Sequence, residues 1–279
     1  MSNSDHPLST TGSASIPQFN SLLDLRALTS ARVALDRTGA SITTRHALEF
    51  SLAHAQARDA VHAALGVASL MAALRERELA AVSVRSSAAN RTEYLRRPDL
   101  GRTLNDASAT LLAVRATDTR SPHTDAATVS IILADGLSAL AVERHALPLL
   151  DALLPLLGLN EENDAKQVAL PWALAPIVVA ERARVALGDE IGEALHADVT
   201  VMLIGERPGL SSPDSLGAYI TWAPRIGRTD AERNCVSNIR VEGLDYTAAA
   251  ARIAWYVTEA RRLGLTGVAL RGSDTALLP

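Results

Sequence analysis

The chain has 279 residues, of which 48% are hydrophobic and 21% charged, so it can bury one substantial core and is not disordered as a whole. Lys and Arg (27) nearly balance Asp and Glu (31), and a net charge of −4 argues against nucleic acid or an anionic membrane as a partner. The one cysteine, Cys235, excludes a disulfide within the chain and favours a reducing compartment.

Residues 1–19 are polar and rich in Ser and Thr, and we predict that they are disordered. They lack the cationic start and apolar run of a secretory signal. Nowhere do about 18 apolar residues follow one another, as a membrane-spanning helix requires. We therefore expect a cytoplasmic protein without a membrane partner.

Residues 20–79 are predicted to form a small all-helical N-terminal lobe. Apolar residues recur at helical spacing over residues 20–35, again from residue 44 to 65, and over residues 67–77. The Arg-Glu-Arg-Glu end of the third segment is expected to be a solvated face.

From residue 80 to 279 the pattern changes to alternating strands and helices, which favours βαβ crossovers and a mostly parallel sheet. Strands are predicted over residues 81–85, 127–134, 172–180, 199–204, 218–222 and 266–270. Helices are predicted over residues 104–114, 138–157, 189–195 and 247–263. The fold class is thus α/β, with a Rossmann-like, mostly parallel sheet flanked by helices and preceded by the helical lobe.

Ligands of such sheets bind where the chain leaves the carboxyl ends of the strands, and two turns stand at such ends. The first is Ala134-Asp135-Gly136-Leu137-Ser138, in which Gly136 permits a tight turn and the N–H groups of the next helix can meet an anion. Alternatively, Asp135 and Ser138 only cap that helix.

The second turn is Gly205-Glu206-Arg207-Pro208-Gly209-Leu210, directly after a strand expected to be buried. The carboxylate of Glu206 can accept hydrogen bonds from amide or hydroxyl donors of a bound molecule. Alternatively, it forms a surface ion pair with Arg207 or Arg225, worth about 0–1 kcal/mol.

No catalytic apparatus and no metal site is predicted. Cys235 has no histidine near it in the sequence, and a lone cysteine is most often a small buried hydrophobe. His54 and His62 share one predicted helix, but they lie about two turns apart, too far to hold one metal ion. Phosphate-binding glycine loops and the G-x-S-x-G nucleophile motif are absent.

Seven short sequence segments, in the same order along roughly residues 22–270, resemble the small (light) subunit of ethanolamine ammonia-lyase. They are Thr29-Ser30-Ala31-Arg32-Val33, Ala57-Arg58-Asp59-Ala60-Val61, Arg97-Pro98-Asp99-Leu100-Gly101-Arg102, Ala134-Asp135-Gly136-Leu137-Ser138, Gly188-Asp189-Glu190-Ile191-Gly192-Glu193, Gly205-Glu206-Arg207-Pro208-Gly209-Leu210 and Cys235-Val236-Ser237-Asn238-Ile239.

The resemblance implies a subunit that docks on a large TIM-barrel subunit in a higher hetero-oligomer, with base-on adenosylcobalamin between them. The complex would convert ethanolamine to acetaldehyde and ammonia by a radical mechanism, whereas the isolated chain would be inactive. The family also includes enzymes of bacterial microcompartments, but no targeting helix is evident at this N-terminus.

Carried over residue by residue, the family's cobalamin contacts fall on Val185, Glu206 and Cys235. The match is looser at Val185, where the preceding residues Arg182-Ala183-Arg184 depart from the family's usual sequence. Between Arg225 and Cys235 the chain is a residue shorter than many relatives. Two other readings stay open: a stand-alone Rossmann-like nucleotide-binding protein using Asp135–Ser138, and a purely structural partner subunit.

Overall fold

The computed structural model describes Val33, Leu35 and residues 37–38, 40–119, 126–159 and 172–270. The chain divides into two compact units, Met1–Ser51 and Leu52–Pro279. The predicted disordered segment 1–19 lies outside the described residues, as does nearly all of the predicted helix over residues 20–35. The predicted division at residue 80 stays a prediction.

The first unit contains a short antiparallel pair, β1 (Arg37–Thr38) and β2 (Ser41–Ile42), and the beginning of α1 (Thr44–His62). The predicted helical segment therefore also contains this hairpin. The last helix of that predicted segment, α2 (Val67–Glu76), belongs to the second unit and packs on the sheet through Leu70 and Leu74. No single helix in the described part of the chain is long and apolar enough to cross a membrane. The pair α1 and α2 reaches that length and composition together but bends by 74° at its break.

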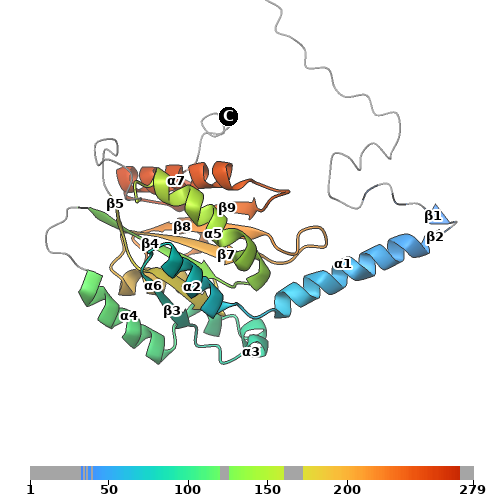
Figure 1. Cartoon of the computed structure of the whole chain (residues 1–279), viewed down its shortest axis with the longest axis horizontal. Coiled ribbons are helices and arrows are strands. Elements are labelled where there is room, and N and C mark those ends of the chain that lie inside the picture. Colours follow the sequence, from blue (N-terminus) through green and yellow to red (C-terminus); the bar gives the residue numbers. More distant parts are fainter. Residues whose placement is uncertain are drawn as a thin grey trace, which may run out of the picture. The chain divides into compact units, whose positions relative to one another are not determined.

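The second unit is built on a seven-stranded sheet in the order β3-β6-β4-β7-β8-β9, with β5 beside β4 (Figure 1). Its strands are β3 (Ala81–Arg85), β4 (Ala127–Ala134), β5 (Trp172–Leu174), β6 (Ile177–Glu181), β7 (Val199–Gly205), β8 (Leu216–Trp222) and β9 (Asn234–Ile239). Strands β3 to β7 pair in parallel, whereas β8 and β9 are antiparallel to their neighbours. The predicted α/β class and mostly parallel sheet are confirmed.

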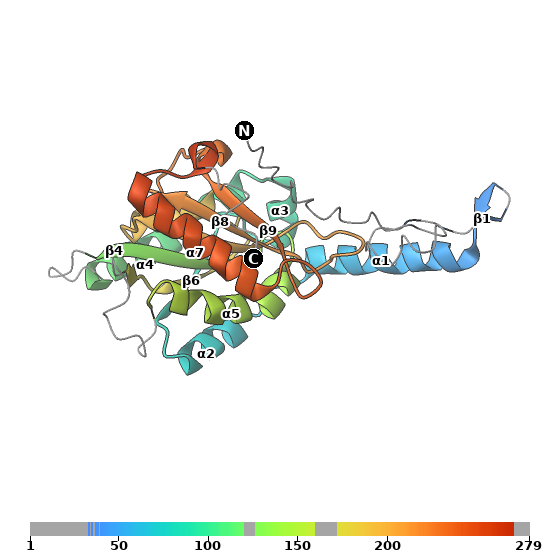
Figure 2. The same cartoon turned by 90° about the horizontal axis from the view of Figure 1, so that it is seen from above.

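Helices cover both faces of this sheet. They are α3 (Arg91–Arg96), α4 (Asp106–Thr119), α5 (Ala139–Leu156), α6 (Leu187–Ala194) and α7 (Tyr246–Leu263), with short 3-10 turns η2 (Leu100–Arg102), η3 (Asp230–Glu232) and η4 (Gly267–Ala269). One face packs against α2, α5 and α7, and the other against α4 and α6; Figure 2 shows α5 and α7 side by side.

The pleat of β4 explains its largely apolar sequence. Val129, Ile131 and Leu133 enter the core under α5 and α7, whereas Ile132 and Ala134 enter the core under α4 and α6. A strand covered on both faces favours apolar side chains at most of its positions. This is why residues 127–134 were predicted to the residue.

Two strand predictions need correction. The predicted strand over residues 172–180 is two strands, because Pro176 has no N–H group to continue the ladder; β5 and β6 pair with different halves of β4. The predicted closing strand over residues 266–270 is wrong: the chain forms η4 there, with Gly267 at a φ of +88° and held by the Asn234 side chain.

Candidate functional site

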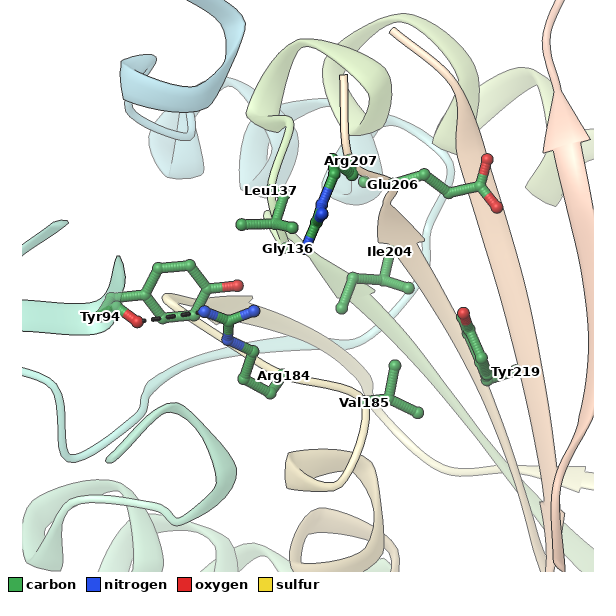
Figure 3. Close-up of a pocket in the computed structure, with 10 residues that line it drawn as sticks. Tyr94, Gly136, Leu137, Arg184, Val185, Ile204, Glu206, Arg207 and Tyr219 are labelled. Carbon is green, nitrogen blue, oxygen red and sulfur yellow. Dashed lines mark hydrogen bonds between the residues drawn. The ribbon is translucent and has the colours of Figure 1, made fainter. Parts of the chain in front are cut away.

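The loops that follow β4, β6 and β7 meet at the carboxyl-terminal end of the sheet, because parallel strands place their carboxyl ends together. They enclose a hollow of about 400 Å³, shown in Figure 3 and called the first hollow below. It is lined by Tyr94, Gly136, Leu137, Arg184, Val185, Ile204, Gly205, Glu206, Arg207 and Tyr219.

The backbone at this edge is packed too closely for side chains at two positions. Gly136 has a φ of +53°, and a Cβ atom added there would lie 2.2 Å from the Gly205 carbonyl oxygen. A Cβ atom on Gly205 would lie 2.0 Å from the Ser138 carbonyl oxygen. The Leu137 N–H donates to the Gly205 carbonyl at 2.9 Å. Both positions therefore require glycine, and the two loops are held together.

The Asp135 side chain links the loop that follows β4 to the loop that follows β6. Its buried carboxylate accepts hydrogen bonds from the Ala183 N–H (3.0 Å) and from Arg91 Nη1 (3.2 Å). Burial raises the pKa of the Asp135 carboxyl, and the Arg91 charge and nearby N–H donors act in the opposite direction. Ser138 caps α5, since its hydroxyl oxygen accepts from the Ala141 N–H at 3.3 Å. The prediction that this turn caps the helix is thus confirmed for Ser138, whereas Asp135 connects the loops after β4 and β6.

Tyr94 supports Arg184 at the rim of the first hollow. Its ring lies between two guanidinium groups, that of Arg91 at 4.7 Å and that of Arg184 at 4.4 Å from the centroid. Its hydroxyl donates to the Ala183 carbonyl at 3.0 Å, and burial raises its pKa. Arg184 Nη2 also donates to the Tyr94 carbonyl at 3.2 Å, so the aromatic ring and the backbone both fix the guanidinium.

Glu206 leaves the end of β7 with its carboxylate turned toward β8 and β9 (Figure 3). One oxygen, Oε2, accepts hydrogen bonds from the Ser215 hydroxyl and from the Asn238 N–H, the latter at 3.3 Å. The other oxygen, Oε1, lies over Gly217, where a Cβ atom would approach it to 3.0 Å. Glu206 is thus held by the fold rather than by the surface ion pair considered from sequence.

Cys235 lies on β9 directly opposite Tyr219 of β8, and the two side chains interact. The Cys235 thiol is exposed and also contacts the Ser237 hydroxyl at 3.1 Å. Surrounding atoms desolvate the thiol and raise its pKa, so it is protonated at neutral pH and is no thiolate nucleophile. Desolvation also raises the pKa of the Tyr219 hydroxyl.

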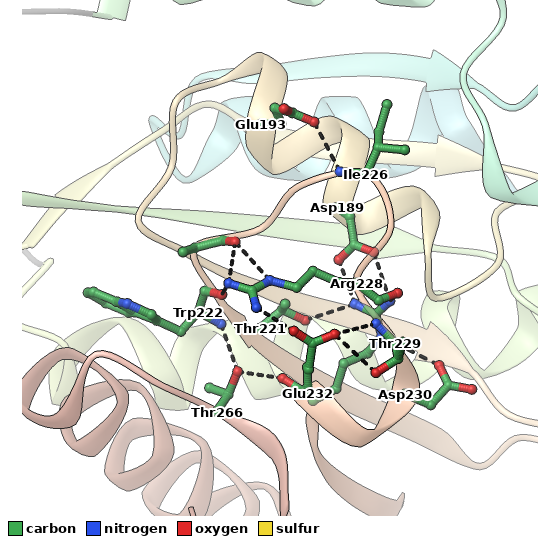
Figure 4. A network of polar contacts seen from close by, with 12 residues as sticks. Asp189, Glu193, Thr221, Trp222, Ile226, Arg228, Thr229, Asp230, Glu232 and Thr266 are labelled. Carbon is green, nitrogen blue, oxygen red and sulfur yellow. Dashed lines mark hydrogen bonds and ion pairs between the residues drawn. The ribbon is translucent and has the colours of Figure 1, made fainter. Parts of the chain in front are cut away.

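A second hollow, of about 490 Å³, adjoins the first, because Arg184, Val185 and Tyr219 line both. Its far wall is the segment that leads into β9, lined by Arg228, Thr229, Asp230 and Arg233. The buried carboxylate of Asp189 on α6 binds Arg233 through two hydrogen bonds, 2.5 and 2.7 Å long (Figure 4). Arg233 also donates to the Arg228 carbonyl at 2.8 Å. These contacts fix the wall against α6.

Comparisons with known proteins match residues 19–271 to the family described as ethanolamine ammonia-lyase light chain (EutC). An ethanolamine ammonia-lyase small subunit from Pseudomonas paraeruginosa is 51% identical over 252 residues, covering 90% of this chain and 87% of the relative. That of Azotobacter vinelandii is 53% identical over 247 residues (88% and 86%), and that of Pseudomonas syringae pv. tomato 48% over 268 residues (96% and 88%).

The chain belongs to the ethanolamine ammonia-lyase light-chain family. It is accordingly a subunit of a carbon–nitrogen lyase, as the resemblance of its seven sequence segments implied.

The three residues that the light-chain resemblance assigns to the cofactor converge in the structure. Val185 and Glu206 line the first hollow, and Cys235 touches Tyr219, which lines it too. Sequence reasoning missed Tyr219, Tyr94 and Arg184. Residues 218–222 were predicted as a strand, so Tyr219 could be placed in the sheet from sequence. Its position opposite Cys235 could not, because β9 was not predicted.

Proposed function

We propose that this chain is the small subunit of an adenosylcobalamin-dependent ethanolamine ammonia-lyase and binds the cofactor at its interface with a large TIM-barrel subunit. The complex would convert ethanolamine to acetaldehyde and ammonia. One observation carries the proposal: Val185, Glu206 and Cys235 belong to three separate segments, and all three lie near Tyr219, since Val185 and Glu206 line the first hollow with Tyr219 and Cys235 lies opposite it on β9.

The chemistry of the site suits cobalamin. This cofactor is a broad apolar ring with carboxamide side chains at its rim, joined to a nucleotide by a phosphodiester. The hollows offer apolar contacts from Val185, Leu137 and Ile204, and the Glu206 carboxylate is an acceptor for carboxamide N–H groups. Arg184 supports the fit further, because its buried Nε has no hydrogen-bond partner among the residues that the structure describes.

The division of labour between the subunits follows from the residues present. When bound, adenosylcobalamin supplies the radical chemistry, and the protein binds and orients it. In this chain Glu206 would accept a hydrogen bond from the cofactor, while Val185 and the protonated Cys235 thiol would pack against it. We propose no catalytic residue here, so the isolated chain should release no acetaldehyde from ethanolamine. Release by purified chain free of large subunit would contradict this.

We further propose that cobalamin is bound base-on, that the complex is a higher hetero-oligomer and that it works in the cytoplasm. No histidine approaches the three proposed contact residues in any hydrogen bond or ion pair of the described chain. Assembly inside a bacterial microcompartment is an alternative that fractionation of cells would decide.

The nucleotide-binding alternative finds less support. The turn at Asp135–Ser138 uses its own donors, since the Leu137 N–H bonds Gly205 and the Ser138 N–H bonds Asp135 at 3.0 Å. A phosphate at this turn would have to compete with those bonds. The purely structural alternative predicts no cofactor contact at all.

One titration distinguishes the three functions. Adenosylcobalamin is added to this chain, to the large subunit and to the reconstituted complex, and binding is followed by absorbance of the corrin. The proposal predicts tight binding by the complex and weaker binding by either subunit. Equal affinity of the large subunit with and without this chain would favour a structural role. Binding of ATP or NAD by the isolated chain would favour the nucleotide reading.

A further inference from the structure

Arg184 carries donors that the described chain leaves without acceptors. Of its guanidinium atoms, only Nη2 is engaged, at the Tyr94 carbonyl, and the buried Nε has no partner among the described residues. Figure 3 shows one end of this group against Tyr94 and the other directed into the first hollow. An arginine held by an aromatic ring loses little further freedom when it binds an acceptor.

Arg207 enters the same hollow from the opposite side. It follows Glu206 at the end of β7, lines the first hollow, and points toward Arg184 in Figure 3. Its side chain is exposed, and no hydrogen bond or ion pair within the described chain involves it. Two guanidinium groups from separate loops thus face one space.

The acidic groups nearby are already committed to other partners. The Glu206 carboxylate lies on the β8 side of the hollow, directed away from the two arginines, and accepts hydrogen bonds from Ser215 and Asn238. Asp135 is buried beneath the loops against Arg91 and the Ala183 N–H. Neither neutralises Arg184 or Arg207, so this part of the hollow has an excess of positive charge and of unpaired N–H donors.

We propose that Arg184 and Arg207 together form a phosphate-binding subsite, and that in the assembled enzyme they bind the phosphodiester of cobalamin's nucleotide loop. This inference rests on the proposed function and specifies which part of the cofactor lies in the first hollow. A planar guanidinium matches a phosphate with two parallel hydrogen bonds, and the pairing of opposite charges strengthens them. A free phosphate or a nucleotide offers the same chemistry.

The test compares two corrinoids on the reconstituted complex. Cobalamin carries the phosphodiester, whereas cobinamide lacks the phosphodiester and the lower base but keeps the ring and its carboxamides. Dissociation constants are measured by absorbance titration for wild type, Arg184→Gln, Arg207→Gln, Arg184→Lys and a control, Arg75→Gln, on the exposed face of α2. Complex assembly is checked by size-exclusion chromatography.

Each Gln variant is expected to weaken cobalamin roughly ten- to hundredfold, as the loss of a charge-assisted hydrogen bond predicts, and cobinamide by less than about threefold. Arg184→Lys should retain part of the cobalamin affinity, because it keeps the charge but not the paired donors. Arg75→Gln should change neither. Because Arg207 is exposed, its variant keeps the test valid if Arg184→Gln disturbs the Tyr94 stack.

Three outcomes would contradict the inference. Equal losses for both corrinoids would mean that the arginines contact the ring or support the loops. Unchanged cobalamin affinity, with inorganic phosphate or ATP binding that both Gln variants abolish, would assign the subsite to a free anion. A wild-type complex that binds neither corrinoid would overturn the proposed function itself, which the first two outcomes leave intact.

Discussion

Asp189 and Arg233 form a buried, two-point ion pair that joins the segments carrying two of the proposed cofactor contacts. Asp189 lies on α6, four residues after Val185, and Arg233 lies two residues before Cys235. Their side chains are only 3% and 2% exposed. The pair therefore holds the chain just before Cys235 against the helix that follows Val185.

Asp189→Asn should lower the free energy of unfolding by about 3–5 kcal/mol, because it leaves the Arg233 charge buried without its partner. Urea unfolding of the variant measures this. The matched control is Asp230→Asn, since Asp230 lies 3.5 Å from the same arginine but is 97% exposed. The control should change stability by less than about 0.5 kcal/mol. Similar effects of both substitutions would show that the buried pair has no special role.

Gly136→Ala should be more destabilising than Gly227→Ala. Both glycines have positive φ, +53° and +97°, so an alanine is strained at either position. At Gly227 the added Cβ meets nothing within 4 Å, whereas at Gly136 it meets the Gly205 carbonyl. We expect a loss of about 1–2 kcal/mol from strain alone at Gly227 and of more than about 3 kcal/mol at Gly136. Equal losses in denaturant unfolding would mean that the loops separate easily.

Asp214 should stabilise the fold at neutral pH and lose that effect in acid. Burial opposes its ionisation, but the hydrogen bond from Arg144 (2.8 Å) and the His145 ring 3.3 Å away outweigh this and hold its pKa below the usual 3.8. A lowered carboxyl pKa contributes stability that is present above the unfolded value and lost as pH falls through the folded value.

The measurement is the stability difference between wild type and Asp214→Asn across pH. It should not shrink between pH 7 and about pH 5, and it should decline as pH falls below 3.8, where the unfolded carboxyl is already more than half protonated and the folded one begins to follow. A difference that vanished already near pH 5 would show that the Asp214 carboxyl titrates above its usual range.

Strands with a regular apolar pattern could be predicted from sequence, and those with an interrupted pattern could not. Residues 127–134 match β4, which is covered on both faces, and residues 81–85 match the edge strand β3, in which buried side chains alternate with less buried ones. The edge strand β9 was missed, since Asn234, Ser237 and Asn238 interrupt its apolar pattern. Local sequence does not reveal which chain pairs at an edge.

The candidate site divides in the same way. The turns after β4 and β7 were predicted to lie at one sheet edge, because strand ends can be read from the chain in order. The contacts that complete the site join residues far apart: Tyr94 meets Arg184, and Cys235 meets Tyr219. Such pairs depend on strand order and on loops with positive φ, as at Arg182 (+55°), which no periodicity indicates.

The central claim is that Glu206 contacts cobalamin, and the affinity of the reconstituted complex for adenosylcobalamin tests it most directly. Glu206→Ala should weaken binding roughly ten- to hundredfold through the loss of one charge-assisted hydrogen bond. Glu206→Gln, which keeps the shape and one acceptor oxygen, should lose less. Glu76→Ala, at an exposed position of α2, is the control and should bind normally. Turnover of Glu206→Ala at saturating cofactor should fall only modestly. Unchanged cobalamin affinity in a fully assembled Glu206→Ala complex would contradict the account and leave the residue a structural role between Ser215 and Asn238.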